Sequence, residues 1–127
     1  MAITNSEKVK EFMLVMGQKV RDIPTYIPEE EMSLRFALND EEHNELQEAI
    51  EEENLVKIVD ALTDILYVTY GFGHALGVDL DACLEEAHSS NMSKLGSDGK
   101  PIYREDGKVL KGPNYRAPNF EKVLKIK

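Results

Sequence analysis

The chain has 127 residues and a formal net charge of −9, from 15 Lys and Arg against 24 Asp and Glu. This length predicts one domain, and a composition of 42% hydrophobic and 31% charged residues excludes a disordered or membrane-embedded chain. No apolar run approaches the ~20 residues of a membrane span, and residues 1–10 lack the basic-then-apolar order of a signal peptide. The single cysteine, Cys83, excludes an intrachain disulfide and favours a cytoplasmic location.

The charge is divided unevenly along the chain. Residues 1–88 carry 20 acidic and 6 basic side chains (20 − 6, net −14), whereas residues 89–127 carry 4 and 9 (9 − 4, net +5). An acidic body argues against nucleic-acid binding. The division suits either a site that holds a cation with a polyphosphate or a solvated helical body with a basic tail.

The first segment predicts a helix over residues 6–20, because apolar side chains recur at helical spacing: Val9, Phe12, Met13, Met16 and Val20. Pro24 and Pro28 then interrupt the helical pattern, since residues before proline favour extended geometry. Residues 22–28 are therefore expected to form a short ordered loop.

Two long helices are expected next. The second begins near Pro28, a favourable first-turn residue, and runs to about Glu53. The third runs from about Leu55 to Ala75 and is apolar nearly all round, so the pattern places it at the centre of a helix bundle.

A fourth helix is expected after a stop at Gly77, with Asp79 as its N-cap. Beyond Leu95 turn signals dominate, and a small hairpin is expected around Asp106-Gly107, followed by a short helix near residues 119–124. The predicted fold is all-α, a four-to-five-helix bundle. It forms one domain over residues 1–127, with a helical core over 1–94 and an irregular basic arm over 95–127.

Acidic residues occupy positions of the second helix where apolar ones are expected. At 100° of rotation per residue, one side of this helix carries both apolar and acidic residues: Leu34, Leu38, Glu41, Glu42, Glu45 and Ala49. The three glutamates should therefore project toward the interior or into a cleft at its edge. On the third helix Asp60 and Asp64 lie one turn apart, among residues that offer little polar surface.

Such a set of carboxylates fits a metal site. Buried carboxylates repel one another and lose hydration, and a divalent cation removes both effects. Mg²⁺, or Mn²⁺ as the second choice, prefers oxygen ligands and commonly binds carboxylates together with substrate phosphates. A solvated acidic surface is the alternative, since residues 29–53 hold eleven acids and one strong base, Arg35, which would either pair with a glutamate or touch ligand.

These motifs resemble a known family. Glu41-Glu42-His43-Asn44-Glu45, followed by Asp60-Ala61-Leu62-Thr63-Asp64, is similar to the Glu-Glu-x-x-Glu and Glu-x-x-Asp signatures of the MazG-like all-α nucleoside triphosphate pyrophosphohydrolases. The tail segments Asn91–Lys94, Asp98–Pro101 and Asp106–Lys111 resemble the phosphoribosyl-ATP pyrophosphohydrolase-like branch. One departure is that the second-motif glutamate falls on Ala61, so Asp60 would have to replace it.

The resemblance implies an enzyme that cleaves between the α- and β-phosphates of a (deoxy)nucleotide with Mg²⁺, giving a monophosphate and pyrophosphate. It carries over metal ligation to Glu42, Glu45 and Asp64, with Asp60 as a further ligand. It makes Glu41, Glu42 and Glu45 the candidates for catalysis, with Glu41 favoured as the group that orients or deprotonates water. It also implies a homodimer or a dimer of dimers, and a role in control of the deoxynucleotide pool.

The basic arm then has candidate phosphate ligands: Asn91, Lys94, Lys108, Lys111 and Arg116. Gln18 is a candidate for the base pocket. Two other functions remain open on the sequence: phosphoribosyl-ATP hydrolysis in histidine biosynthesis, and a non-catalytic acidic helical protein that binds a metal, a nucleotide or a partner.

Overall fold

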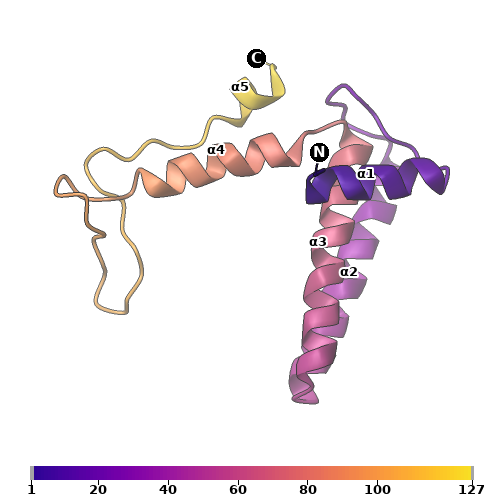
Figure 1. Cartoon of the computed structure of the whole chain (residues 1–127), viewed down its shortest axis with the longest axis horizontal. Coiled ribbons are helices and arrows are strands. Elements are labelled where there is room, and N and C mark those ends of the chain that lie inside the picture. Colours follow the sequence, from indigo (N-terminus) through magenta and orange to yellow (C-terminus); the bar gives the residue numbers. More distant parts are fainter. Residues whose placement is uncertain (1, 127) are drawn as a thin grey trace. The chain divides into compact units, whose positions relative to one another are not determined.

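The computed structural model describes residues 2–126, and the described residues form five helices and no β-strand. The helices are α1 (Asn5–Val15), α2 (Glu29–Glu51), α3 (Leu55–Leu76), α4 (Leu80–Met92) and α5 (Phe120–Leu124) (Figure 1). The predicted all-α fold is confirmed. None of these helices is long and apolar enough to cross a membrane.

The chain divides into two compact units, Met1–Leu80 and Asp81–Lys127. The division falls after Leu80, the first residue of α4, whereas the sequence predicts a helical core over residues 1–94. The single-domain organisation stays a prediction, and each unit is described by itself below.

Helix α1 is shorter than its apolar pattern suggested. Thr4 and Glu7 form a capping box at its start, where each side chain accepts a hydrogen bond from the other residue's backbone N–H. The helix ends at Val15 and not at Val20, because Gly17 adopts a left-handed conformation (φ 73°) and the Gln18 N–H bonds back to the Met13 carbonyl. Met16 and Val20 therefore lie beyond the helix.

Helices α2 and α3 form a long hairpin and lie side by side in Figure 1. The turn between them is short: Glu53 takes a left-handed conformation, and the Asn54 side chain accepts a hydrogen bond from the Lys57 N–H to cap α3. Ala49 of α2 and Ala61 of α3 are both buried. The connection makes the two helices antiparallel, so residues of α2 face residues of α3 in reverse order.

The loop before α2 is fixed onto the end of α3. Arg21 and Thr25 donate backbone hydrogen bonds to the carbonyls of His74 and Leu76. The Arg21 guanidinium also pairs with Glu31 of α2 and donates to the Ala75 carbonyl at 2.6 Å. The loop therefore ties the N-terminal part of α2 to the C-terminal part of α3.

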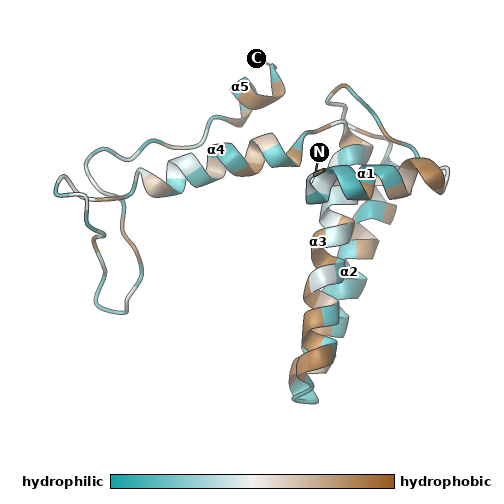
Figure 2. Ribbon diagram, viewed as in Figure 1, coloured by the Kyte–Doolittle hydropathy of each residue, from teal (hydrophilic) through white to brown (hydrophobic). Residues whose placement is uncertain are grey.

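The expectation that α3 lies at the centre of a bundle is not met within one chain. Besides Val56 (79%), four of its aliphatic side chains are strongly exposed: Leu55 at 72%, Val59 at 53%, Leu62 at 48% and Leu66 at 59%. They are spaced four, three and four residues apart and so follow one side of the helix. Figure 2 shows the hydrophobic colouring concentrated along α3.

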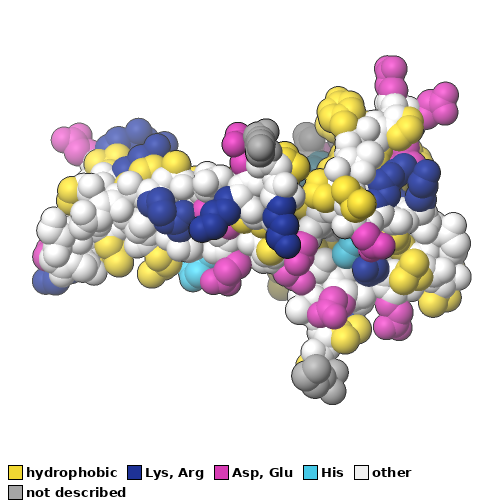
Figure 3. All heavy atoms as spheres, turned by 90° about the horizontal axis from the view of Figure 1, so that it is seen from above, with side chains coloured by type: hydrophobic (Ala, Val, Ile, Leu, Met, Phe, Trp, Pro, Cys, Tyr) yellow, Lys and Arg dark blue, Asp and Glu magenta, His cyan; other side chains and the backbone are white. Residues whose placement is uncertain are grey.

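In the second unit the C-terminal arm returns to α4. A bridge between Tyr103 and Val109 forms the predicted hairpin around Asp106-Gly107. Arg116 pairs with Glu86 of α4 at 2.7 Å, and the Asn119 N–H donates to the same carboxylate. Figure 3 shows several Lys and Arg side chains on one face of this unit.

Gly77 provides a test of the loop–helix contact. Both Gly77 and Gly17 have φ 73°, but a Cβ on Gly77 would collide with the Ile23 carbonyl group, 2.6 Å from its carbon, whereas a Cβ on Gly17 meets nothing within 4 Å. We expect Gly17→Ala to cost about 1–2 kcal/mol of unfolding free energy from the conformation alone. Gly77→Ala should cost clearly more, as measured by urea denaturation. Equal losses in the two variants would contradict the close packing of the loop on α3.

Candidate metal centre

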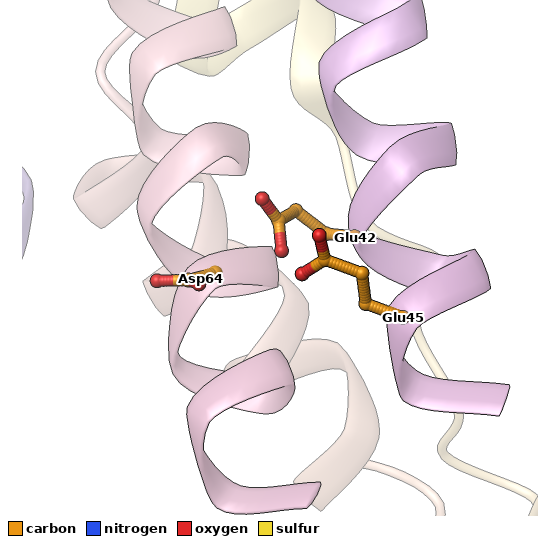
Figure 4. Close-up of side chains that lie close together, drawn as sticks. All are labelled: Glu42, Glu45 and Asp64. Atoms are coloured by element: carbon orange, nitrogen blue, oxygen red, sulfur yellow. The ribbon is translucent and has the colours of Figure 1, made fainter. Parts of the chain in front are cut away.

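Three of the predicted acidic residues come together between α2 and α3. Glu42 and Glu45 lie on α2 and Asp64 on α3, and one carboxylate oxygen from each lies within 4.8 Å of the others. Figure 4 shows Glu42 and Glu45 projecting from α2 toward α3. Three negative charges at this spacing repel one another strongly unless a proton or a cation is present.

Glu42 is the carboxylate most affected by this arrangement. Its Oε2 atom is buried and has no hydrogen-bond partner among the described residues. The pKa of Glu42 is raised to about 7, first by burial, next by hydrogen bonding and repulsion with Glu45, and then by the charges of Asp64 and Glu41. The site therefore holds a proton near neutral pH in the absence of a metal.

Asp64 and Asp60 extend the acidic surface on α3. Burial raises the pKa of Asp64, and the charge of Asp60 one turn away raises it further. Asp60 is exposed and lines a cavity of about 270 Å³ with Glu45 and five other residues: Glu48, Ala49, Glu52, Lys57 and Ala61. Asp60 thus lies beside the three-carboxylate cluster and is not one of its members.

The residues present fit a divalent cation of the Mg²⁺ class. All three groups offer hard oxygen ligands, and one of these oxygens, Oε2 of Glu42, is buried without a hydrogen-bond partner. The site is open to solvent on the side of Glu45, which is exposed, whereas Glu42 and Asp64 are half-buried. Such an ion would bind the unpartnered Oε2 atom of Glu42. It would also replace the proton that burial and the neighbouring carboxylates favour on Glu42 in its absence. Its remaining positions would be free for water or phosphate oxygens.

The other predicted residues of the first unit lie near the cluster or away from it. Glu41 is exposed on α2, close enough for its charge to act on Glu42. Gln18 lies exposed in the turn after α1, where its backbone closes the helix. Within residues 2–126 no hydrogen bond joins the Gln18 side chain to the carboxylates, so its place in a base pocket stays a prediction.

The five candidate phosphate ligands all belong to the second unit. Asn91 lines an exposed concavity of about 400 Å³ on α4, and Lys94 is half-buried at the end of that helix. The Lys111 ammonium lies 4.8 Å from the centre of the Tyr115 ring, and Lys108 is exposed in the hairpin. Arg116 is engaged with Glu86, and the hydrogen bond from the Asn119 N–H, followed by this Arg116 contact, holds the pKa of Glu86 below its ordinary value.

Two residues of the first unit have a clearer role in the structure than in the sequence. His74 of α3 contacts α1, where its Nε2 atom lies 2.7 Å from the Ser6 carbonyl oxygen. Arg35 is half-buried beside Gly71, a contact that the acidic pattern of α2 did not reveal. The available signal was that Arg35 is the one strong base among eleven acids.

Comparison with known proteins decides the family. The phosphoribosyl-ATP pyrophosphohydrolase family model matches residues 9–91, which include α2, α3 and all three carboxylates of the cluster. The chain belongs to this family. The resemblance drawn from the acidic motifs is thereby confirmed.

Two individual proteins are similar to this member of the phosphoribosyl-ATP pyrophosphohydrolase family. A structure described as a "putative NTP pyrophosphohydrolase" from Exiguobacterium sp. 255-15 matches with a TM-score of 0.52 and 28% identity, covering 98% of this chain and 94% of that one. Uncharacterized protein L479 of Acanthamoeba polyphaga mimivirus is 32% identical over an alignment that covers 97% of this chain. The chain spans about half (47%) of the length of that curated relative.

The pKa of Glu42 generates a prediction about stability in metal-free buffer. Between its ordinary value and about 7, folded Glu42 keeps a proton that the unfolded chain releases, so this group lowers stability as pH rises through that interval. Glu42→Gln removes the effect. We expect its unfolding free energy, relative to wild type, to increase from about pH 5 to about pH 8.

Chemical denaturation in EDTA measures this difference, with Glu51→Gln at the exposed end of α2 as the control. Glu51→Gln removes an exposed charge from the same helix, so the pH trend of Glu42→Gln is compared with that of Glu51→Gln. The same trend in both variants would show that the cluster does not perturb the Glu42 carboxyl group.

Proposed function

We propose that this chain is a Mg²⁺-dependent nucleoside triphosphate pyrophosphohydrolase, which cleaves a (deoxy)nucleotide between its α- and β-phosphates to give a monophosphate and pyrophosphate. The observation that carries the proposal is the cluster of Glu42, Glu45 and Asp64, with carboxylate oxygens within 4.8 Å, in a member of a pyrophosphohydrolase family. A role in controlling the deoxynucleotide pool is part of the proposal.

The chemistry of the cluster supports this reaction. In the proposed step a water oxygen bonds to phosphorus while the bond from that phosphorus to the α–β bridging oxygen breaks, and the water proton passes to a base. A bound divalent cation offsets phosphate charge and lowers the pKa of water. Glu42, Glu45 and Asp64 would hold the ion, Mg²⁺ or alternatively Mn²⁺, and Asp60 would supply a further oxygen beside it.

Glu41 is our candidate for the base. It is exposed, it lies next to Glu42 on α2, and in this proposal it is not occupied by the metal. We assign phosphate binding to the basic and amide side chains of the second unit and base recognition to Gln18; the phosphate candidates are Asn91, Lys94, Lys108, Lys111 and Arg116. Release of Arg116 from Glu86 would be required before it could bind a phosphate.

The substrate is tested with purified protein, Mg²⁺ and a panel of ribo- and deoxynucleoside triphosphates together with phosphoribosyl-ATP. We expect pyrophosphate as the product, measured separately from orthophosphate, with a deoxynucleoside triphosphate turned over fastest. The family model's own name favours phosphoribosyl-ATP as the second candidate. Turnover of phosphoribosyl-ATP alone would replace the proposed substrate.

Single substitutions test the site itself. Glu42→Gln, Glu45→Gln and Asp64→Asn each remove a metal-binding charge with little change in shape, so we expect a fall in kcat of at least about 100-fold with the helical fold retained. Circular dichroism checks the fold, and Glu51→Gln is the matched control. Full activity in all three variants would refute the site.

A wild-type protein that releases no pyrophosphate with either metal would favour the non-catalytic alternative, to which the alanine at position 61 lends support.

We also propose that the enzyme is a homodimer or a dimer of dimers, assembled through the apolar side of α3. The exposed side chains Leu55, Val59, Leu62 and Leu66 repeat at the four-three spacing of helix-pairing seams. An apolar stripe of this kind is stabilised when a second copy covers it.

Leu62→Glu with Leu66→Glu should therefore yield monomers, because burying two carboxylates in an apolar interface is unfavourable. Light scattering coupled to gel filtration measures the mass. Leu84→Glu, on a residue of α4 with similar exposure (62%), is the control and should leave the mass unchanged. A monomeric wild type would refute the assembly without affecting the metal site.

A further inference from the structure

Arg35 occupies the point where α1, α2 and α3 meet. Its Nη1 atom lies 3.1 Å from where a Cβ of Gly71 would stand, and the side chains of Met13 and Val9 from α1 come within 3.7 and 3.9 Å of the same position. A glycine inside a helix costs about 1 kcal/mol relative to alanine. At this position the missing side chain leaves room for the guanidinium against the backbone of α3.

The guanidinium has no partner there. Its Nε atom is buried without a hydrogen bond, and Arg35 donates no side-chain hydrogen bond and forms no ion pair anywhere in residues 2–126. Glu31, one turn earlier on α2, is the nearest acid to act on it, but both oxygens of Glu31 accept from Arg21. Burial lowers the pKa of Arg35, and the charge of Glu31 only partly opposes this. The fold thus holds a partly desolvated cation without a counter-ion, which is unfavourable for folding.

The position of Arg35 relative to the acidic cluster follows from helix geometry. Arg35 precedes Glu42 by seven residues on α2, and its neighbour Gly71 follows Asp64 by seven residues on the antiparallel α3. Seven residues correspond to about 10 Å along a helix and return to nearly the same side. The guanidinium therefore lies on the cluster's side of the helix pair, two turns away from the carboxylates.

The same geometry separates Arg35 from the apolar stripe of α3. Gly71 follows Leu66 by five residues, which is about 140° around the helix. A second copy seated on the stripe would therefore not bring its carboxylates to Arg35 by that contact. A small anion bound beside the cluster could reach the guanidinium from the same side of the helix pair.

We propose that Arg35 is the anion-binding end of the active site, where its guanidinium takes a phosphate group of a polyphosphate whose other end is held at the Glu42–Glu45–Asp64 cluster. This inference rests on the proposed function. Arginine suits the role because its planar group binds two phosphate oxygens at once and remains charged when buried. Gly71 is then a positioning residue, since its lack of a side chain sets where the guanidinium lies.

Calorimetric titration of the intact protein separates the two ends of this site, with Mg²⁺ alone and with pyrophosphate in excess Mg²⁺ as the ligands. We expect Arg35→Gln to bind Mg²⁺ like wild type but to bind pyrophosphate at least about tenfold more weakly. Arg35→Lys keeps the charge but loses the planar guanidinium group, so its pyrophosphate affinity should fall between those of wild type and Arg35→Gln. Gly71→Ala, whose Cβ would displace the guanidinium, should weaken pyrophosphate binding while keeping the charge.

Lys10→Gln is the matched control, because it removes a cation of the same unit that pairs with Asp22 at the surface. It should leave both titrations unchanged. Arg35→Met provides a second measurement: removal of an unpaired, half-buried cation should not lower the midpoint of thermal unfolding in buffer without metal or phosphate.

Three results would overturn the proposal. The first is an unchanged pyrophosphate affinity in Arg35→Gln. The second is a change in the solution mass of Arg35→Gln, which would show that a carboxylate of a second copy pairs with Arg35. The third is a lowered unfolding midpoint in Arg35→Met, which would show that Arg35 has a structural role. Absence of Mg²⁺ binding by wild type would refute the proposed function instead. Pyrophosphate titrated without metal into wild type and Arg35→Gln would then decide the Arg35 site by itself.

Discussion

The arrangement of this protein depends on holding three carboxylates within 4.8 Å of one another between two antiparallel helices. Their mutual repulsion would separate α2 from α3 if the helices were paired only at the site. The pairing is secured at other points: by the short capped turn at Asn54, by the buried alanines 49 and 61, and by the Asn39–Thr69 hydrogen bond at 3.1 Å. The pKa of Glu42 is raised to about 7 first by burial and then by Glu45, Asp64 and Glu41, so it reflects both the lost hydration and the repulsion at this site when no cation is present.

The same constraint explains why the first unit buries so little of its apolar surface. Positions of α2 and α3 that would fill a core in an ordinary helical hairpin carry acids or alanine, and several of the larger aliphatic side chains of α3 are exposed. The buried aliphatic residues are few: Val9, Met13, Ile27, Ala49, Ala61 and Ala75. Stability lost at the site therefore has to come from elsewhere, and the exposed stripe on α3 is the apolar surface from which a second copy would supply it.

Sequence reasoning was accurate where local chemistry decides the structure. The Gly77 stop, the hairpin at Asp106-Gly107 and the inward phase of Glu42 and Asp64 follow from residue type and helical period. It was wrong where a local competitor was overlooked: apolar spacing extended the first helix to Val20, but Gly17 closes it at Val15. It also placed α3 inside a bundle, because an apolar sequence shows how much surface needs covering and not which molecule covers it.

The sequence by itself determined the all-α fold, the acidic helix pair and the family, because each of these is written in residue types at fixed helical spacing. The tertiary structure alone decided which acids meet. Glu42, Glu45 and Asp64 converge, while Asp60 lies beside them on the cavity wall, since the distance between two helices depends on the packing of both. It also decided that Arg35 lies against Gly71 without a counter-ion, a contact between residues 36 positions apart that no local pattern encodes.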